Sequence, residues 1–181
     1  MSGFELRLAA LEEFEALRHM LDVANEYAAA RSPEPQWMLM DRVYAQLRKG
    51  IEANQCYVMT GEDNVPVASV TITEADLYTW GDMGNDGRAL YFHKLMKDPS
   101  LAPPKVTPRL LKFVAQQAIA SGKEFVRADT KTNQENLIAY YKKFGMVEQG
   151  ERPYVKSSYR AVLLQIPARQ LLTNCEAAFS T

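Results

Sequence analysis

Cysteine and histidine are scarce in this sequence, which holds two of each among 181 residues. Cys56 and Cys175 lie far apart and belong to no paired motif, so the sequence predicts neither a disulfide framework nor a zinc site. We therefore expect no metal cofactor and a reducing, cytoplasmic setting.

Long apolar runs and an excess of one charge are also missing. No apolar stretch approaches the ~18 residues of a membrane-spanning helix, and the first seven residues lack the basic and apolar stretches of a secretory signal. The formal net charge is -1, so no overall field draws the protein to nucleic acid or to an anionic membrane. We expect neither among its partners.

The composition is that of an ordinary globular protein, with 47% hydrophobic and 24% charged residues. A chain of this length fits one domain, residues 1–181, and can bury a core without metals or disulfides. Apolar periodicity predicts a mixed α/β fold: an antiparallel meander, then a β-α-β crossover with parallel strands. The predicted strands are residues 4–8, 55–60, 65–73, 89–97, 125–129, 146–149 and 161–166, and the predicted helices are residues 11–30, 40–51, 107–120 and 133–144.

Local patterns add detail to these elements. The strand at 65–73 alternates apolar residues with hydroxyl residues, which predicts one buried face. Pro33 and Pro35 break the first helix, and Thr107 and Pro108 suit the N-cap and the first position of the third. Residues 61–64 form a turn, residues 82–88 a loop, and residues after 167 carry no clear assignment.

Three segments resemble the GNAT N-acetyltransferase superfamily. They are residues 90–99 (LYFHKLMKDP), 110–114 (LLKFV) and 133–146 (NQENLIAYYKKFGM). The last resembles the family's signature of Asn, a short helix, Tyr, then Gly and an apolar residue. The resemblance implies a GNAT-like acyl-CoA N-acyltransferase fold, with a mostly antiparallel central sheet and a parallel β-α-β splay.

The same resemblance implies how the chain is divided. Residues 1–88 would hold the N-terminal helices and hairpin, residues 89–166 the cofactor-binding half, and residues 167–181 a tail. Acetyl-CoA would be the co-substrate, and its pantetheine would enter between the strands at 90–97 and 125–129. Exposed backbone groups of Leu95, Met96 and Lys97 would pair with the pantetheine amides.

The loop that would hold the pyrophosphate departs from the family pattern. Lys105 and Thr107 stand where glycines are expected, and Ala102 replaces a Gln or Arg. Glycine lets backbone approach phosphate closely in unusual conformations, which lysine and threonine do not adopt easily. Lys105, Val106, Thr107 and Arg109 remain the candidate phosphate contacts, through charge and the helix N-terminus. The alternative is a capped surface loop with solvated charges.

Tyr141 and His93 are the candidate catalytic residues. The resemblance implies that the Tyr141 phenol protonates the departing coenzyme A thiolate, although its helical spacing also fits core packing. His93 suits a general base for the attacking amine, or a hydrogen-bonded structural residue. Glu74 and Asp76 are rival bases.

Asn133 and Asn136 are candidate cofactor contacts at the start of the last helix. Both also suit an N-capping role. Residues 31–37 and 77–88 are expected to border the acceptor, with Trp37, Tyr78 and Trp80 offering apolar surface. Exposed aromatic residues equally suit a homodimer interface.

These observations support two hypotheses. The first is an enzyme that moves an acetyl group from acetyl-CoA to a primary amine of a small molecule or peptide. The second is a GNAT-shaped domain without acetyltransferase activity that binds another ligand or serves as an interaction module. The altered loop motivates the second.

Overall fold

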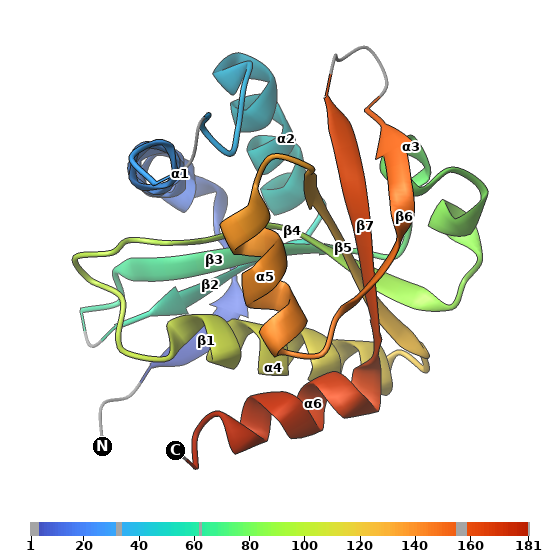
Figure 1. Cartoon of the computed structure of the whole chain (residues 1–181). Helices are drawn as coiled ribbons and strands as arrows, with labels where there is room; N and C mark the ends of the chain where they lie inside the picture. The colour runs from blue at the N-terminus through green and yellow to red at the C-terminus, as the bar shows by residue number, and fades with distance from the viewer. Residues whose placement is uncertain (1–3, 32–33, 62, 155–158, 181) are drawn as a thin grey trace. The chain divides into compact units, whose positions relative to one another are not determined.

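The computed structural model describes residues 4–31, 34–61, 63–154 and 159–180. The chain forms two compact units. Figure 1 shows their helices and strands. The first unit comprises Met1–Ile72 and Lys94–Thr107, and the second comprises Thr73–His93 and Pro108–Thr181. Pro33 and Glu62, expected in a helix break and a turn, lie outside the described residues.

The first unit packs two helices on a small antiparallel sheet. In this sheet β1 pairs with β2, and β2 pairs with β3. Leu17 and Leu21 of α1 and Leu47 of α2 are fully buried and belong to one apolar cluster, as their helical spacing predicts. The elements are β1 (Glu5–Leu8), η1 (Leu11–Glu13), α1 (Phe14–Ala29), α2 (Met40–Glu52), β2 (Cys56–Thr60) and β3 (Pro66–Thr73), with the second part of β4 (Ala89–Lys97).

Strand β3 is buried on both faces, so the prediction of a single buried face is wrong. Ser69 and Thr71, on the expected polar face, are 1% and 6% exposed. Helix α2 covers this face at Gly50, where an added Cβ would lie 3.3 Å from the Thr71 side chain. The Ser69 hydroxyl finds a partner in the Cys56 sulfur at 3.4 Å. The alternating pattern thus separated polar from apolar residues in β3, but the approach of α2 determined that both faces are buried.

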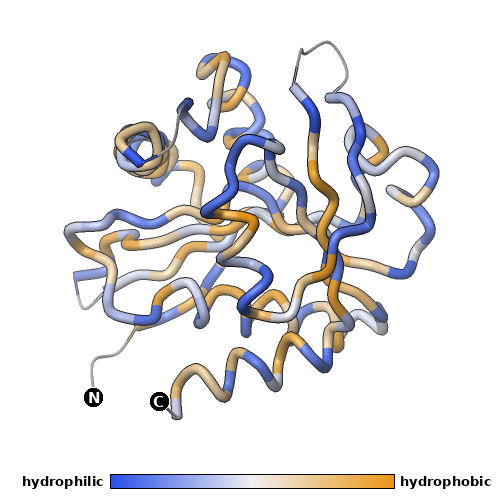
Figure 2. Tube along the Cα trace, in the orientation of Figure 1, coloured by the Kyte–Doolittle hydropathy of each residue, from blue (hydrophilic) through white to orange (hydrophobic). Residues whose placement is uncertain are grey.

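The second unit contains the predicted crossover. Its strands run in the order β4-β5-β7-β6, with β4 and β5 parallel and the remaining pairs antiparallel. Strand β7 is largely buried, whereas β6 is exposed along its whole length. Figure 2 shows that β7 is mostly hydrophobic and β6 mostly hydrophilic. The elements are α3 (Leu77–Trp80), η2 (Gly81–Asn85), the first part of β4, α4 (Val106–Ala120), β5 (Phe125–Lys131), α5 (Glu135–Lys143), β6 (Val147–Pro153), β7 (Arg160–Pro167) and α6 (Ala168–Ala177).

Several element boundaries differ from prediction. Helix α4 begins at Val106, so Thr107 and Pro108 lie within its first turn and Thr107 is not the N-cap. Helix α5 follows Gln134, so neither Asn133 nor Asn136 is its N-cap. Helices α3 and η2 occupy much of the segment expected as a loop, and α6 fills the unassigned end. None of the helices in the described ranges is both long and apolar enough to cross a membrane.

Candidate active site

The parallel pairing of β4 with β5 sets two polar side chains beside each other. The pairing runs from Ala89–Phe125 to Tyr91–Arg127. Tyr91 and Arg127 share a face of the sheet, because the Tyr91 hydroxyl accepts a 2.7 Å hydrogen bond from the Arg127 guanidinium. Side chains alternate along a strand, so His93 and Asp129, each two residues further on, project from that same face.

Asp76 reaches the same place from the turn after β3. Its Oδ1 accepts a hydrogen bond from the Thr79 backbone N–H at 3.0 Å, which caps α3. Its backbone N–H donates to the Gly84 carbonyl at 2.7 Å. A Cβ at Gly84 would lie 2.2 Å from the Asp76 carbonyl oxygen, so only glycine allows this close approach. The turn and η2 thus hold Asp76 in one position.

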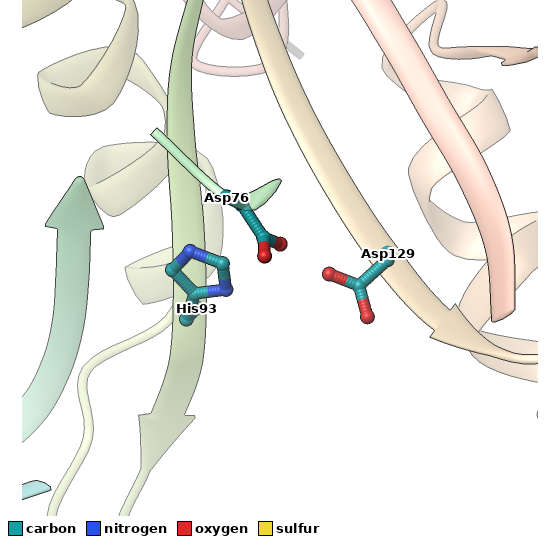
Figure 3. A group of neighbouring side chains, drawn as sticks. All are labelled: Asp76, His93 and Asp129. Carbon is teal, nitrogen blue, oxygen red and sulfur yellow. The ribbon is translucent and has the colours of Figure 1, made fainter. Parts of the chain in front are cut away.

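Asp76, His93 and Asp129 converge from three separate segments (Figure 3). One nitrogen or oxygen atom from each lies within 4.8 Å of the other two. Oδ2 of Asp76 is buried and makes no hydrogen bond to the residues described here. Two carboxylates beside an imidazole make an electronegative centre that favours a proton or another cation between them.

The hydrogen bonds of Thr73 determine how His93 presents its ring. The Thr73 hydroxyl lies 3.1 Å from His93 Nε2 and donates its one proton to the Ala75 carbonyl, also at 3.1 Å. A hydroxyl that donates to this carbonyl accepts from His93 in the tautomer whose hydrogen is on Nε2. The other ring nitrogen, Nδ1, lies on the side of Asp129 (Figure 3). In that tautomer of the neutral ring, Nδ1 has the lone pair that can take a proton.

Tyr154 fixes the Asp129 carboxylate from the other side. Its hydroxyl donates to Asp129 Oδ2 at 2.5 Å. Burial, together with the negative charge of Asp129, raises the pKa of Tyr154 far above its ordinary value. The phenol thus stays protonated and keeps donating to Asp129.

Arg127, two residues before Asp129 on β5, is buried at 1% exposure. It forms a 2.8 Å ion pair with Asp86, and it donates to the Gln165 side chain at 2.6 Å and to the Met83 carbonyl at 2.7 Å. Its guanidinium also lies 5.0 Å from the Trp80 ring centroid. These contacts join β5 to the segment that carries Asp76 and satisfy a charge that would otherwise be costly to bury.

The aromatic residues expected beside the acceptor separate into two groups. Tyr78 is exposed, whereas Trp80 is fully buried against Tyr91 at a ring-centroid distance of 5.7 Å, so it offers no surface to a ligand. Trp37 is half-buried and packs on the apolar cluster of the first unit. Glu74, one of the rival bases, has a side chain 75% exposed and pairs with Lys123 at 3.2 Å, outside the cluster.

Tyr141 is 6% exposed and packs edge-on against Phe92 and Tyr140, at centroid distances of 5.5 and 6.2 Å. Burial, followed by the charges of Tyr140 and Asp129, raises the pKa of Tyr141 well above its ordinary value. The residue therefore has the buried environment of a core aromatic and also a phenol proton that is held firmly at neutral pH.

The candidate cofactor residues show one unexpected conformation. Lys105 has a φ of 59°, the left-handed conformation that the glycine of the family pattern would supply. Lysine thus takes the conformation expected of a glycine, although residues with a side chain rarely adopt it. Leu95 is half-buried, Met96 is buried in the first unit's core and Lys97 is exposed.

The remaining candidates lie near helix starts. Val106 is buried, Thr107 is half-buried, and the Arg109 guanidinium lies 5.3 Å from the Phe179 ring centroid. Asn133 is half-buried and Asn136 is exposed at the start of α5.

Sequence reasoning did not identify Asp129, Tyr154, Thr73 or Arg127. Asp129 was counted only as the end of a strand. Asp129 lies near His93 just beyond the last pair of β4 and β5, Tyr91 with Arg127, and the sequence alone does not give this register.

Comparison with known proteins gives the following similarities. The profile of the acetyltransferase (GNAT) family matches residues 14–146. An acetyltransferase of the GNAT family from Listeria monocytogenes 4b F2365 is 18% identical with a TM-score of 0.72, over 92% of this chain and 98% of that one. The yncA protein of Salmonella typhimurium, solved with its cofactor acetyl-CoA, is 14% identical with a TM-score of 0.62, over 92% and 95%.

The aminoglycoside acetyltransferase AAC(6')-Ib, solved with coenzyme A and kanamycin, is 15% identical with a TM-score of 0.67, over 93% of this chain and 96% of that one. At these identities the likeness shows a shared fold. No curated protein matches the chain at a significant level.

Proposed function

Because the chain belongs to the GNAT acetyltransferase family, we propose that it is an N-acetyltransferase that moves the acetyl group of acetyl-CoA to a primary amine. The observation that carries this proposal is the His93 ring, whose Nε2 is held by Thr73 and whose Nδ1 lies beside two carboxylates. Such an arrangement suits the removal of a proton from a cationic amine.

The loop before α4 supports the proposal of an acyl-CoA donor. The left-handed backbone of Lys105 allows the turn that a glycine would otherwise make, and Lys105 and Arg109 bring positive charge. Pro108 lacks an N–H, so the donors of the first turn are Val106 and Thr107. We assign the diphosphate to these four residues, the pantetheine to the backbone of Leu95, Met96 and Lys97, and further cofactor contacts to Asn133 and Asn136.

The acetyl-CoA thioester supplies an acetyl carbon that a neutral amine attacks. Asp76 and Asp129 attract the acceptor in its ammonium form, and His93 Nδ1 takes its proton. The two carboxylates then stabilise the imidazolium, while Thr73 keeps the ring oriented. The Tyr141 phenol donates a hydrogen bond to the sulfur as the carbon–sulfur bond breaks. The second proton of the amine, which the nitrogen loses as the amide forms, passes to the thiolate through this phenol, so that Tyr141 ends the reaction protonated. The products are an acetamide and the free thiol of coenzyme A.

The acceptor is proposed to be a small molecule or peptide that joins a primary amine to an apolar part. Leu77, Tyr78 and Met83 are exposed on the segment that carries Asp76. Apolar surface beside an electronegative centre suits such a ligand. A screen of small amines and amino-terminal peptides, read by release of free thiol from acetyl-CoA, identifies the preferred acceptor.

Replacing His93 tests the base. With the best acceptor from the screen, His93→Gln should lower kcat/KM by about 100-fold or more, the usual effect of losing a general base. Glu74→Gln is the matched control, since Glu74 is exposed and lies outside the cluster, and it should change the rate by less than about 2-fold. Equal activity of the His93→Gln variant and the wild type would remove His93 from the mechanism.

The altered residues of the loop favour one other function, a domain of this fold that binds a ligand without transferring acetyl. Tyr141→Phe distinguishes the two. If the protein is an enzyme, this change should lower the rate about 10-fold or more and leave acetyl-CoA affinity unchanged. If wild-type protein binds no acetyl-CoA in a calorimeter at millimolar concentration, the transferase is rejected and the binding module stands.

A further inference from the structure

We propose that Asp76, His93 and Asp129 form a site for a zinc-type divalent cation. The three side chains come from the turn after β3, from β4 and from β5, and each offers one ligand atom (Figure 3). These atoms lie within 4.8 Å of one another. A tetrahedral Zn²⁺ with bonds of about 2 Å needs ligand atoms about 3.3 Å apart. A bound Zn²⁺ would hold the three ligand atoms at this spacing.

A buried oxygen of Asp76 gives a second observation, independent of the clustering. Oδ2 of Asp76 is buried and accepts no hydrogen bond within the described part of the chain, whereas Oδ1 is occupied by the Thr79 N–H. A buried carboxylate oxygen without a partner destabilises the fold. A cation between Asp76, His93 and Asp129 would supply that partner.

Each of the three side chains is also oriented by a hydrogen bond on its other polar atom. Thr73 holds His93 through Nε2, Tyr154 donates to Oδ2 of Asp129, and the Thr79 N–H donates to Oδ1 of Asp76. Outer hydrogen bonds of this kind are a regular feature of metal sites, where they fix the histidine tautomer and the direction of each ligand.

The chemistry of the ligands selects the class of metal. Two carboxylates neutralise a divalent charge, and one imidazole nitrogen favours Zn²⁺ or Co²⁺ over Mg²⁺, which prefers oxygen ligands. The three side chains leave a fourth position for water. A bound cation would occupy the lone pair of His93 Nδ1, so zinc should inhibit acetyl transfer. The predicted inhibition rests on the proposed function, whereas the predicted binding of zinc does not.

Calorimetry on the full chain, freed of metal with a chelator, tests the site directly. Titration with ZnCl₂ should give one equivalent bound with micromolar or tighter affinity. Co²⁺ should give the visible absorption of a four- or five-coordinate ion. His93→Gln and Asp129→Asn should each weaken Zn²⁺ binding at least 10-fold, and Tyr154→Phe about 10-fold through the outer contact. Glu74→Gln, the exposed acid on the same turn, should bind like the wild type.

Two results overturn the site. One is the absence of stoichiometric Zn²⁺ binding to the wild-type chain. The other is unchanged binding by the folded His93→Gln variant, as judged by circular dichroism. The transferase is tested separately, because acetyl transfer is measured in the presence of chelator. Zinc binding without acetyl transfer would support the metal site and reject the proposed function. Acetyl transfer without zinc binding would support the proposed function and reject the metal site.

Discussion

Arg127 is a buried cation whose hydrogen-bond partners connect β5 to the segment that carries Asp76. Its side chain is 2% exposed, and that of its partner Asp86 is 24% exposed. The Arg127 hydrogen bond is the main reason that the pKa of Asp86 lies below its ordinary value. Removing one partner of a buried pair leaves an uncompensated charge, so the pair is a point at which the fold is sensitive to a single residue.

The change Asp86→Asn should lower the free energy of unfolding by about 3 kcal/mol at pH 7. Because the folded-state pKa of Asp86 is depressed, its stabilisation is present above the unfolded value of about 3.9 and is lost as the pH falls through the folded value. Urea denaturation at pH 7 and pH 3 measures both. The gap between the variant and the wild type should shrink at pH 3.

A matched control comes from the exposed ion pair of Glu151 and Arg160, whose side chains are about half exposed. Glu151→Gln should change stability by less than about 0.5 kcal/mol at either pH. A gap for Asp86→Asn that is as large at pH 3 as at pH 7 would show that packing, and not the charge, is responsible.

The short segment from Asp76 to Asn85 is the element that positions the site. Asp76 caps α3, and its backbone N–H bonds the Gly84 carbonyl at 2.7 Å, where a Cβ would come within 2.2 Å of backbone. From β6, Arg152 donates to the Trp80 carbonyl at 3.0 Å. The position of Asp76 therefore depends on the backbone of this whole segment.

Gly84→Ala should destabilise the protein by about 2–3 kcal/mol, because the new methyl group overlaps backbone atoms that have little room to move. Displacement of Asp76 should also weaken Zn²⁺ binding. Gly87→Ala is the control: its φ is 72° and nothing lies within 4 Å of the added Cβ, so only a backbone cost of about 1 kcal/mol is expected. Thermal denaturation and calorimetry compare the two. Equal losses would contradict the close contact at Gly84.

The molecule as a whole should be stabilised by its acyl donor. A ligand that binds only the folded state adds about 2.7 kcal/mol at 100 times its Kd. For a chain of 181 residues this corresponds to a rise in Tm of about 5–10 °C. Scanning fluorimetry with increasing acetyl-CoA measures the shift, with sodium acetate as the control. No shift up to millimolar acetyl-CoA would count against the proposed donor.

Periodicity predicted the elements with strong local signals. Strand β4 matches its predicted residues 89–97, and α2 matches within a residue. Helix α6 was missed although Ala168, Leu171 and Cys175, at helical spacing, are its buried residues. That signal was available, but the segment is short and no Ser, Thr, Asp or Asn cap marks its start at Pro167.

Burial and convergence depended on tertiary contacts. The sequence shows a tryptophan at position 80 in a segment with acidic residues. It does not show that this side chain is buried, because burial results from its packing against Tyr91 and Arg127. The hydroxyl face of β3 is buried for a comparable reason, the approach of α2 at Gly50. A sequence pattern gives the polarity of a residue, but the residues packed around it determine whether it is exposed to water.

The sequence alone determined the mixed α/β class, the β-α-β crossover and the family, because these follow from local periodicity and from short motifs. Only the tertiary structure decided that Asp76, His93 and Asp129 share one place. Asp76 lies 17 positions before His93, and His93 lies 36 positions before Asp129. Their meeting depends on the register of two parallel strands and on a capped turn, and register is set by the packing of the whole sheet.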